Sequence, residues 1–375
     1  MQNFFLLILI LSFSCSKANK KEKKDSGLEY EGLIDKKATK ETKLLYQNLR
    51  EISNNQILYG HQDDLAFGVN WWAQEGRSDV KDVCGSYPAV FGWELGNLGK
   101  ERNIDSIKFD DLRKWIIKAF EMGGINTISW HMDNPVSQKD SWDVTKAVYS
   151  ILPGGKNHES YKNQLKSFAN FNSSLRDSNK TMVPIILRLL HEQNANWFWW
   201  GKKHCTVDEY VNLFQFTVSY FRDSLNIHNL IYVYSPDGQF DDYKERYPGD
   251  NYVDILGFDY YFRNELSSKE IQVFTNKLID LSALAKSKRK VSVLSETGYE
   301  SIPDSLWHTK AILQPIEKNK GKIKIAYFLV WQNSNKKHNY APYIGHSSCW
   351  DLKKTYDDNM TVFLNDLPKM YVDHK

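Results

Sequence analysis

Eight short apolar runs, spread along the 375 residues, constrain the fold of this chain more than any other feature. Amphipathic segments, among them Phe109–Glu121, Tyr161–Asn179 and Asp208–Ser224, lie between the runs. Strands that alternate with helices indicate a parallel sheet, and eight such units are the number that closes a (β/α)8 TIM barrel. The expected strands are Ile57–His61, Ala89–Leu95, Asn126–His131, Pro184–Glu192, Leu230–Ser235, Val253–Tyr261, Val291–Glu296 and Ile323–Trp331.

Nearly every one of these runs ends in polar or aromatic side chains. The endings are Gly60-His61-Gln62, Trp93-Glu94, Trp130-His131, His191-Glu192, Ser235-Pro236-Asp237, Asp259-Tyr260-Tyr261, Ser295-Glu296 and Trp331-Gln332-Asn333. Active sites of TIM barrels are built at the carboxyl ends of the strands. The sequence therefore predicts a site of acids, histidines and aromatics at that rim, in a single catalytic domain over residues 38–370.

Two of the apolar runs have a glutamate as their last residue. Glu192 ends the run that begins at Pro184, and Glu296 ends the run that begins at Val291, with Gly298 as a turn residue. Two carboxylates on one rim suit glycoside hydrolysis, in which one protonates the leaving oxygen and the other attacks the anomeric carbon; a separation of about 5–5.5 Å gives retention and about 6.5–9.5 Å gives inversion. One such glutamate would more simply be an ordinary strand-terminal acid, but two in polar and aromatic surroundings favour catalysis.

The alternation of side chains along a strand predicts which groups accompany the two glutamates. Arg188 and Glu192 are expected on one face, which would place a guanidinium near that carboxylate. Asp259 and Tyr261 share a face by the same argument. A tyrosine hydroxyl beside Glu296 would hold one carboxylate oxygen in place.

Histidines and tryptophans at the strand ends are candidates for sugar contacts. His131 and His191 would hydrogen-bond sugar hydroxyls, although each is equally well explained as a structural histidine. The segment Trp197–Gly201 holds several large aromatics that are costly to expose, so some must pack inward while at least one forms a sugar platform. Trp331, at the end of the last strand, would lie beneath the sugar next to the cleaved bond.

The charge distribution argues against a nucleic-acid partner. The net charge is +3, and five lysines with one glutamate between residues 16 and 24 account for the whole excess. The body of the chain therefore lacks the basic surface that phosphate neutralisation requires.

The first residues are typical of an exported protein. Phe4–Phe13 is apolar but too short to span a bilayer, as in a secretory signal. Cys15 follows at once in a relaxed lipobox, so residues 1–15 are predicted to be a signal peptide, with a lipid anchor on Cys15 and a periplasmic or outer-membrane location. The lysine-rich residues 16–37 are expected to form a solvated tether. Cys84, Cys205 and Cys349 remain, and they allow at most one disulfide and lack zinc-type spacing.

Together these segments resemble glycoside hydrolase family 26, the β-mannanases, from about Thr39 to Leu367. The most specific piece is Arg188–Gly201, which reads RLLHEQNANWFWWG, with Gln193 and Ala195 replacing the more usual residues around Asn194. Further similar segments are Ser295–Gly298, Gly257–Tyr261, Trp130–Pro135 and Trp331.

The resemblance implies a retaining hydrolysis of β-1,4-mannan without a cofactor or a metal ion. Glu192 would be the acid/base and Glu296 the nucleophile. The substrate-binding residues would be His131, Arg188, His191, Trp197, Asp259, Tyr261 and Trp331, with mannan, galactomannan or manno-oligosaccharides as the ligand.

The loop Ile151–Glu159 bears on where the polymer is cut. Pro153-Gly154-Gly155 is a turn signal that would present Lys156, Asn157 and His158 at its tip. This resembles a loop of mannobiose-releasing members of the family, where it narrows the end of the cleft that binds the non-reducing side. Mannobiose release is therefore expected, and an ordinary polar loop tip is the simpler alternative.

Other functions are compatible with the same sequence features. An endo-acting β-mannanase, or a β-glucanase or β-1,3-xylanase of the same fold, would share the two glutamates. A non-catalytic glycan-binding lipoprotein would keep the tryptophans and need neither glutamate. A metal-dependent hydrolase or deacetylase would use His61, His131 and His191 as ligands, although no HExxH motif is present.

Overall fold

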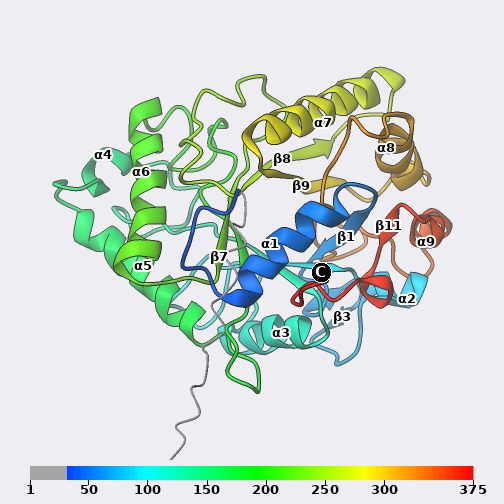
Figure 1. Cartoon of the computed structure of the whole chain (residues 1–375), viewed down its shortest axis with the longest axis horizontal. Coiled ribbons are helices and arrows are strands. Elements are labelled where there is room, and N and C mark those ends of the chain that lie inside the picture. Colours follow the sequence, from blue (N-terminus) through cyan, green and yellow to red (C-terminus); the bar gives the residue numbers. More distant parts are fainter. Residues whose placement is uncertain (1–31, 375) are drawn as a thin grey trace, which may run out of the picture. The chain divides into compact units, whose positions relative to one another are not determined.

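A closed barrel of eight parallel strands forms the centre of the structure, a computed structural model that describes residues 32–374 (Figure 1). The strands neighbour one another in chain order, and β10 pairs with β1 to close the ring, with Leu58 opposite Tyr327 and His61 opposite Val330. The strands are β1 (Ile57–Gln62), β4 (Val90–Glu94), β5 (Ile125–Ser129), β6 (Ile185–Arg188), β7 (Leu230–Tyr234), β8 (Ile255–Phe262), β9 (Val291–Tyr299) and β10 (Tyr327–Val330). The predicted TIM barrel is confirmed, and every predicted strand overlaps an observed one.

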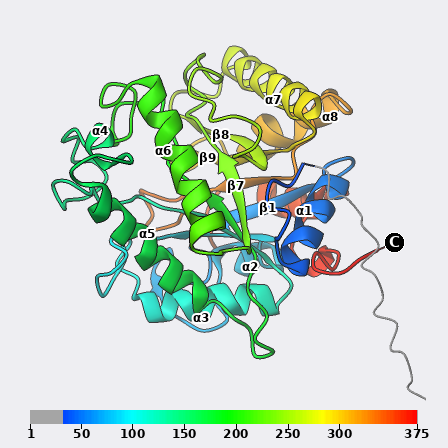
Figure 2. The ribbon, with the colours of Figure 1, turned by 60° about the vertical axis from the view of Figure 1, so that its left-hand side comes forward.

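Helices surround this barrel, as Figure 2 shows for α3, α5, α6 and α7. The α-helices are α1 (Lys40–Ile52), α2 (Asp79–Cys84), α3 (Phe109–Glu121), α4 (Val148–Ile151), α5 (His158–Ser173), α6 (Val207–Ser219), α7 (Ser268–Lys288), α8 (Gln314–Lys318) and α9 (Cys349–Asp357). Two π-helical turns, η1 (Tyr220–Ser224) and η2 (His308–Leu313), adjoin α6 and α8, and η3 (Leu364–Asp366) is a 3-10 turn.

Capping side chains stand at the first turns of several of these helices. Thr206 forms a capping box with Glu209 at the start of α6, and its hydroxyl accepts from the backbone N–H of Glu209. Thr39 and Ser267 cap α1 and α7 in the same way, each accepting from a first-turn N–H. Side-chain oxygens thus satisfy backbone donors that a helix start leaves without intrahelical partners.

The barrel strands are covered on both faces, which explains why they read as continuous apolar runs. Among the residues of the eight barrel strands, Tyr261 is the one that is not fully buried. The large side chains Tyr59, Phe91 and Trp93 of β1 and β4 belong to the buried hydrophobic core. The partial exposure of Tyr261 marks the open rim.

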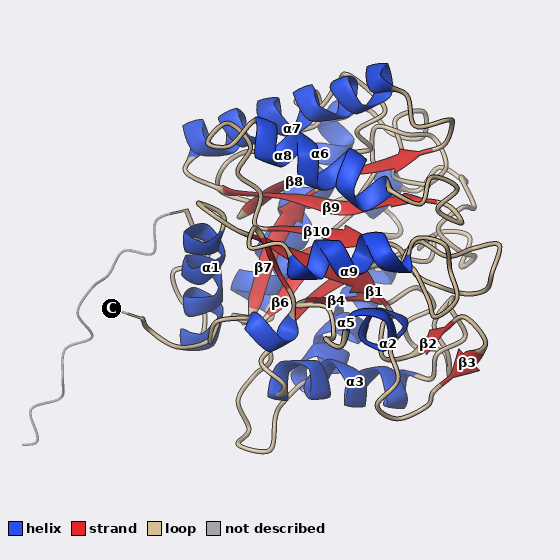
Figure 3. Ribbon diagram, turned by 90° about the vertical axis from the view of Figure 1, so that its right-hand side faces the viewer, coloured by secondary structure: helices blue, strands red, loops and turns tan. Residues whose placement is uncertain are grey.

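Two short strand elements lie outside the ring. β11 (Thr361–Val362) pairs with the start of β1, and β2 (Phe67–Gly68) and β3 (Trp71–Trp72) form an antiparallel hairpin in the segment that follows β1. Figure 3 shows α1 at one end of the barrel and the β2–β3 hairpin at the opposite end. The hairpin therefore projects from the carboxyl end of the strands.

The amino end of the barrel is closed by α1 and the residues before it. The hydroxyl of Tyr46 in α1 donates to the carbonyl of Asp254, which precedes β8. Leu33 and Asp35 are buried, and the N–H of Ile34 donates to Asp254 Oδ1 at 2.7 Å. Residues 32–37, which composition assigned to a solvated tether, thus contact the barrel; the predicted signal peptide, Cys15 and the remaining tether lie outside the described residues.

Within residues 32–374, no helix combines the length and apolar character needed to cross a bilayer. Cys84, Cys205 and Cys349 are all free thiols. Cys84 and Cys205 are buried, and the Cys84 thiol donates to the carbonyl of Val80 at 3.1 Å while Cys205 Sγ accepts from Arg246 Nη1 at 3.3 Å.

Candidate active site

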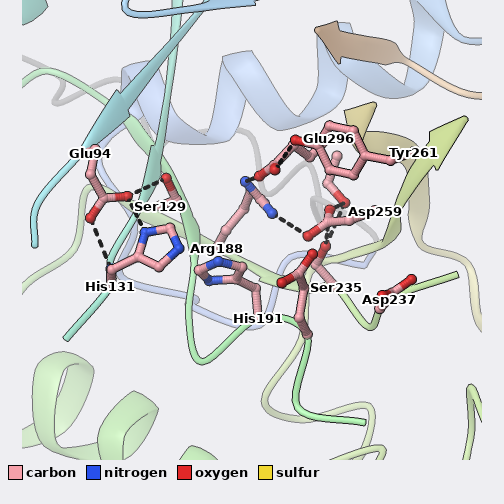
Figure 4. Close-up of polar contacts among 12 residues, drawn as sticks. Glu94, Ser129, His131, Arg188, His191, Ser235, Asp237, Asp259, Tyr261 and Glu296 are labelled. Carbon is pink, nitrogen blue, oxygen red and sulfur yellow. Dashed lines mark hydrogen bonds and ion pairs between the residues drawn. The ribbon is translucent and has the colours of Figure 1, made fainter. Parts of the chain in front are cut away.

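Arg188, the last residue of β6, lies at the centre of the carboxyl rim and bridges two acids. Its Nη1 donates to Glu296 Oε2 at 2.6 Å, and its Nη2 donates to Asp259 Oδ2 at 2.5 Å. The side chain is 1% exposed, and Figure 4 shows it between the two carboxylates. Burial opposes the charge on Arg188, but Asp259 and Glu296 overcome this and raise its pKa.

A shift in strand register brings Asp259 and Glu296 together. Phe258 pairs with Leu294, but Asp259 pairs with Glu296, so Ser295 is the extra residue in β9. A β-bulge of this kind changes the direction of the side chains beyond it, and bulges are common next to active sites. Without the bulge, simple alternation would set Asp259 against Ser295.

Glu296 has a second donor on the side away from Arg188. The hydroxyl of Tyr261 in β8 donates to Glu296 Oε1 in a short hydrogen bond. The predicted contact between a tyrosine hydroxyl and this glutamate is therefore present. Burial and the neighbouring Glu296 raise the pKa of Tyr261, so the phenol keeps the proton that it donates.

Two serines fix the position of Asp259. Its Oδ1 accepts from the hydroxyls of Ser235 at 2.8 Å and Ser295 at 2.9 Å, while Oδ2 accepts from Arg188. The aspartate therefore has donors on both oxygens and is 1% exposed. Burial raises the pKa of Asp259 to about 7 although Arg188 opposes the rise, and the carboxyl groups of Asp259 and Glu296 lie on either side of one buried guanidinium (Figure 4).

Glu192 occupies a turn after β6 and not the strand itself. Its φ of 53° is in the left-handed region, which is strained for a residue with a side chain. The N–H of Glu192 donates to the carbonyl of Ser235 at 2.8 Å, and Trp197 Nε1 donates to Glu192 Oε2 at 2.8 Å. These contacts hold the carboxyl group in an orientation that β-strand geometry does not provide.

The proton affinity of Glu192 is unusual. Part of the side chain stays open to solvent, but burial of the rest raises the pKa well above the ordinary range, and the negative charges of Asp259 and Glu296 raise it further. Glu192 therefore interacts electrostatically with the acids around Arg188. A carboxyl group in this environment retains its proton at pH values where an ordinary glutamate has lost it.

His131 and Glu94 form a buried pair on the neighbouring strands. Glu94 Oε2 accepts from Ser129 at 2.8 Å and lies 2.7 Å from His131 Nδ1, while Glu94 Oε1 accepts from the N–H of His131 at 2.9 Å. Burial opposes the charge on both groups, yet their contact raises the pKa of His131 and lowers that of Glu94. The pair thus stabilises an imidazolium beside a carboxylate.

His191 is a different kind of histidine. It is buried, its ring meets that of His131 edge to face at 4.8 Å, and its carbonyl accepts from Trp200 Nε1 at 2.8 Å. Burial, with Arg188 and His131 nearby, lowers the pKa of His191 well below its ordinary value. His191 is therefore neutral at physiological pH.

The aromatic segment after Glu192 divides between core and cleft, as expected. Phe198, Trp199 and Trp200 are buried, while Trp197 is partly exposed beside Glu192. Trp331 follows β10 and is also partly exposed, with its N–H donating to the carbonyl of Thr297 at 3.1 Å. Trp197 and Trp331 therefore join Tyr261 as predicted aromatic ligands with open surface.

The loop residues Lys156, Asn157 and His158 contact other parts of the molecule. Asn157 Nδ2 donates to the hydroxyl of Ser150 at 3.0 Å, and His158 Nδ1 lies 2.7 Å from the carbonyl of Ile151. The His158 ring packs against Phe216 of α6 with the ring centres 4.8 Å apart. Lys156 is exposed, and with Asn157 it lines a groove of about 770 Å³ that also includes residues 202–207. The contacts of Asn157 and His158 just described are therefore with Ser150, Ile151 and Phe216 and not with Glu192 or Glu296.

One sequence prediction is wrong in its geometry. Arg188 was expected beside Glu192, but its hydrogen bonds go to Asp259 and Glu296. The reason is that β6 ends at Arg188, and the positive φ values of Leu190 and Glu192 break the alternation on which the prediction rested. Ser235, Ser295 and Glu94 also belong to the site, and the sequence signal for them was their place at the strand ends.

The histidines considered as metal ligands have other partners. His61 Nδ1 lies 2.7 Å from Asp64 Oδ1, and His131 Nδ1 lies against Glu94. Over residues 32–374, no group of three or more His, Cys, Asp or Glu side chains is arranged to hold a metal ion.

A parallel (β/α)8 barrel with paired glutamates at its carboxyl rim defines a glycoside hydrolase. Residues 34–363 match the sequence profile of glycosyl hydrolase family 26, and the chain belongs to this family. The structure superposes on a family 26 β-mannanase from Bacteroides ovatus with a TM-score of 0.85 and 38% identity, covering 90% of this chain and 99% of that one. An endo-β-1,4-mannanase from Cellulomonas fimi gives a TM-score of 0.84 at 30% identity, covering 90% and 79%.

Curated relatives carry related names. A mannan endo-1,4-β-mannosidase from Bifidobacterium adolescentis is 35% identical over 282 residues, which are 71% of this chain and only 28% of that longer protein. A mannan endo-1,4-β-mannosidase from Bacillus subtilis strain 168 is 28% identical over 339 residues, covering 86% and 88%.

Proposed function

We propose that this chain hydrolyses β-1,4-mannosidic bonds by retaining double displacement, with Glu192 as acid/base and Glu296 as nucleophile. The contrast between the two glutamates carries the proposal. Glu296 accepts from a guanidinium and a phenol, which is the environment of a carboxylate, whereas burial and nearby acids raise the pKa of Glu192. Pairs of acids whose environments differ in this way divide into donor and nucleophile.

The first chemical step uses both groups at once. Glu192 donates its proton to the glycosidic oxygen while a Glu296 oxygen attacks the anomeric carbon, and the leaving sugar departs as an alcohol. Bond formation removes the negative charge of Glu296, so one of the nearby charges that raise the pKa of Glu192 is lost, while burial and Asp259 remain. Glu192 is then able to act as the base that takes a proton from the incoming water.

The second step returns both groups to their starting state. Water attacks the anomeric carbon of the glycosyl-enzyme, Glu192 takes the water proton, and Glu296 leaves as a carboxylate between Arg188 and Tyr261. Two inversions at one carbon give net retention. Asp259 holds Arg188, and Arg188 holds Glu296, so the aspartate acts through the arginine.

The remaining predicted residues supply the sugar contacts in this proposal. His131, His191, Trp197 and Trp331 offer donors, acceptors and flat apolar surfaces at the same rim, and Trp197 contacts Glu192 directly. Mannan, galactomannan and manno-oligosaccharides are the proposed substrates because the named relatives act on mannan.

The decisive experiment is sugar release from mannan, mixed-linkage β-glucan and β-1,3-xylan, with ¹H NMR of the first product formed. Mannan cleavage with initial formation of the β-anomer is expected, as is a loss of about 10³-fold or more in kcat for Glu296→Ala, on the scale of other nucleophile removals. Preferential cleavage of the glucan or the xylan would contradict mannan as the substrate. Initial formation of the α-anomer would indicate an inverting mechanism. Binding of mannan without cleavage would indicate a non-catalytic glycan-binding protein. Loss of activity in the presence of a chelator would indicate a metal-dependent hydrolase.

Mannobiose release from the non-reducing end is the finer part of the proposal. Asn157 and His158 are held by contacts to Ser150, Ile151 and Phe216, so Lys156 is the side chain of the loop tip that can meet a sugar chain. Mannobiose from the first turnovers on mannohexaose, with longer products in Lys156→Gly, supports this part. A mixture of lengths from the start, as the names of the endo-acting relatives suggest, contradicts it.

Export with a lipid on Cys15 is likewise a proposal, and it rests on the apolar run Phe4–Phe13 and the position of Cys15. Mass spectrometry of the amino-terminal peptide from membrane fractions tests it. A diacylated Cys15 that disappears in Cys15→Ser is expected, whereas an unmodified peptide in the soluble fraction contradicts it.

A further inference from the structure

The β2–β3 hairpin presents an exposed tryptophan on a flat aromatic base. Phe67 and Trp72 pair across the hairpin, with ring centres 5.0 Å apart and planes only 3° from parallel. Phe67 is 4% exposed, but Trp72 is 47% exposed. One face of the Trp72 indole is therefore covered by Phe67, while much of the remaining ring is open to solvent.

The hairpin beneath Trp72 is tightly built. Asp79 is buried and accepts from the N–H of Val69 and from Trp71 Nε1, each at 2.8 Å. A Cβ atom on Gly68 would lie 2.3 Å from Trp71 Nε1 and 2.5 Å from Asp79 Oδ2, so only glycine allows this approach. Because the support is fixed before any ligand arrives, a ligand on Trp72 loses little binding energy to ordering.

The same aspartate connects the hairpin to the loop after Trp331. Asp79 Oδ2 also accepts from Asn333 Nδ2 at 2.8 Å, and Asn333 Oδ1 accepts from the N–H groups of Tyr340 and Ala341 at 2.9 Å. Asn333 follows Trp331 by two residues.

That loop contacts the tyrosine beside Glu296, the proposed nucleophile. The Tyr340 ring packs against Tyr261 with ring centres 5.6 Å apart, and Tyr261 is the residue that donates to Glu296. The hairpin is thus joined by buried hydrogen bonds to one wall of the active site, on the same end of the barrel (Figure 3).

We propose that Trp72 is a sugar-stacking platform that binds a mannosyl unit of the same chain that is being cut, outside the subsites next to the cleaved bond. The proposal rests on the function proposed above. Pyranose rings present apolar C–H faces, which pack on an indole face and remove apolar surface from water. The built connection to the Trp331 loop favours the polysaccharide over an unrelated protein partner as the occupant.

The test measures how chain length affects binding. Calorimetry on proteins that carry Glu296→Ala compares Trp72→Ala with the parent for mannobiose and mannohexaose. Trp72→Ala is expected to weaken mannohexaose binding about 10-fold, the scale of about 1.4 kcal/mol for one lost aromatic contact, and to leave mannobiose unchanged. Equal loss for both ligands, or no loss for either, overturns the proposal.

Trp350→Ala is the matched control, because Trp350 is a second exposed tryptophan, 61% exposed on α9 and outside the β2–β3 hairpin. It is expected to bind both oligosaccharides as the parent does. A loss with Trp350→Ala equal to that with Trp72→Ala would show a general effect of removing surface tryptophans and overturn the proposal.

An NMR measurement on protein that keeps Trp72 tests the proposal even if Trp72→Ala disturbs the local fold. The indole N–H signals of ¹⁵N-tryptophan-labelled protein are recorded, and the signal lost in Trp72→Phe is assigned to Trp72. Mannohexaose is expected to shift this signal, and mannobiose is not. A signal that stays in place at saturating mannohexaose overturns the proposal.

Steady-state kinetics with Glu296 present separates the two proposals. If the wild-type protein cuts mannan and Trp72→Ala leaves KM unchanged, the platform proposal is refuted and the proposed function stands. If the wild-type protein does not cut mannan, both the proposed function and the platform proposal are refuted. The supporting result is mannan cleavage with KM raised about 10-fold and kcat unchanged in Trp72→Ala, the signature of lost uniform binding.

Discussion

Arg188 Nη1 lies 2.6 Å from Glu296 Oε2, and both side chains are almost wholly removed from solvent. A buried charge of this kind is tolerated only when partners compensate for lost hydration. Asp259 provides the second partner, so one guanidinium lies between two carboxyl groups. The arrangement holds Glu296 at one orientation and keeps its oxygen available for attack. Disturbing the arginine should therefore affect catalysis and stability together.

Replacing Arg188 by Met should leave Asp259 and Glu296 buried without a counter-charge. Breaking a buried ion pair by removing one partner costs about 3–5 kcal/mol, so the free energy of unfolding should fall by that scale in urea denaturation. The kcat on mannan should also fall, by about 10²-fold or more, as for loss of a preorganised charge. Arg188→Lys is the control for charge without the fork geometry. Full activity in Arg188→Met would remove the arginine from the mechanism.

Tyr261→Phe should remove one donor to Glu296 and keep the ring. Loss of a single preorganised donor costs about 10²–10³-fold in kcat when it acts in the transition state, and we expect the lower end because Arg188 remains. KM should change little, since the aromatic surface is preserved. The free energy of unfolding should fall by about 1–3 kcal/mol, because a buried carboxylate oxygen loses its donor. A rise in KM with constant kcat would instead assign Tyr261 to substrate binding.

The raised pKa of Glu192 predicts the alkaline limb of the pH profile. The first step needs protonated Glu192, and burial with the nearby acids shifts its deprotonation upward, so kcat/KM should decline at a pH well above the ordinary glutamate value of about 4.3. In Glu192→Ala, this limb should vanish for an aryl mannoside whose leaving group needs no proton. Persistence of the same limb in that variant would assign it to another group.

The strand pattern was sufficient to predict the barrel and the positions of both glutamates. Strand ends converge in a parallel barrel whatever the loops do, so Glu192, Asp259, Tyr261 and Glu296 were placed correctly at one rim. The contact of Tyr261 with Glu296 followed from its position on β8.

Contacts that depend on local departures from strand geometry were not predictable in the same way. The bulge at Ser295 and the left-handed turn at Glu192 decide which carboxylates Arg188 meets, and neither has a clear mark in the sequence. The loop at Lys156 illustrates a second cause. Its turn was visible, but its neighbours on α6 are distant in sequence and appear only in the folded chain.

The Glu94–His131 pair should make stability depend on pH in a defined direction. The pKa of His131 is raised in the folded state, so its contribution is fully present below the unfolded histidine pKa of about 6.5 and is lost as pH rises through the folded value. The pKa of Glu94 is lowered, so its contribution is present above the unfolded value of about 4.3 and is lost as pH falls through the folded one.

Glu94→Gln should therefore destabilise the protein most near pH 5.5–6.5, where both partners are charged, by about 1–3 kcal/mol for a charge-assisted hydrogen bond. The loss should shrink above the folded pKa of His131, because a neutral imidazole gains less from a carboxylate. Urea denaturation at pH 6 and pH 9 measures the difference, and Ser129→Ala is the control, since it removes a neutral donor to the same Glu94 oxygen. An equal loss at both pH values for Glu94→Gln would mean that His131 is neutral throughout.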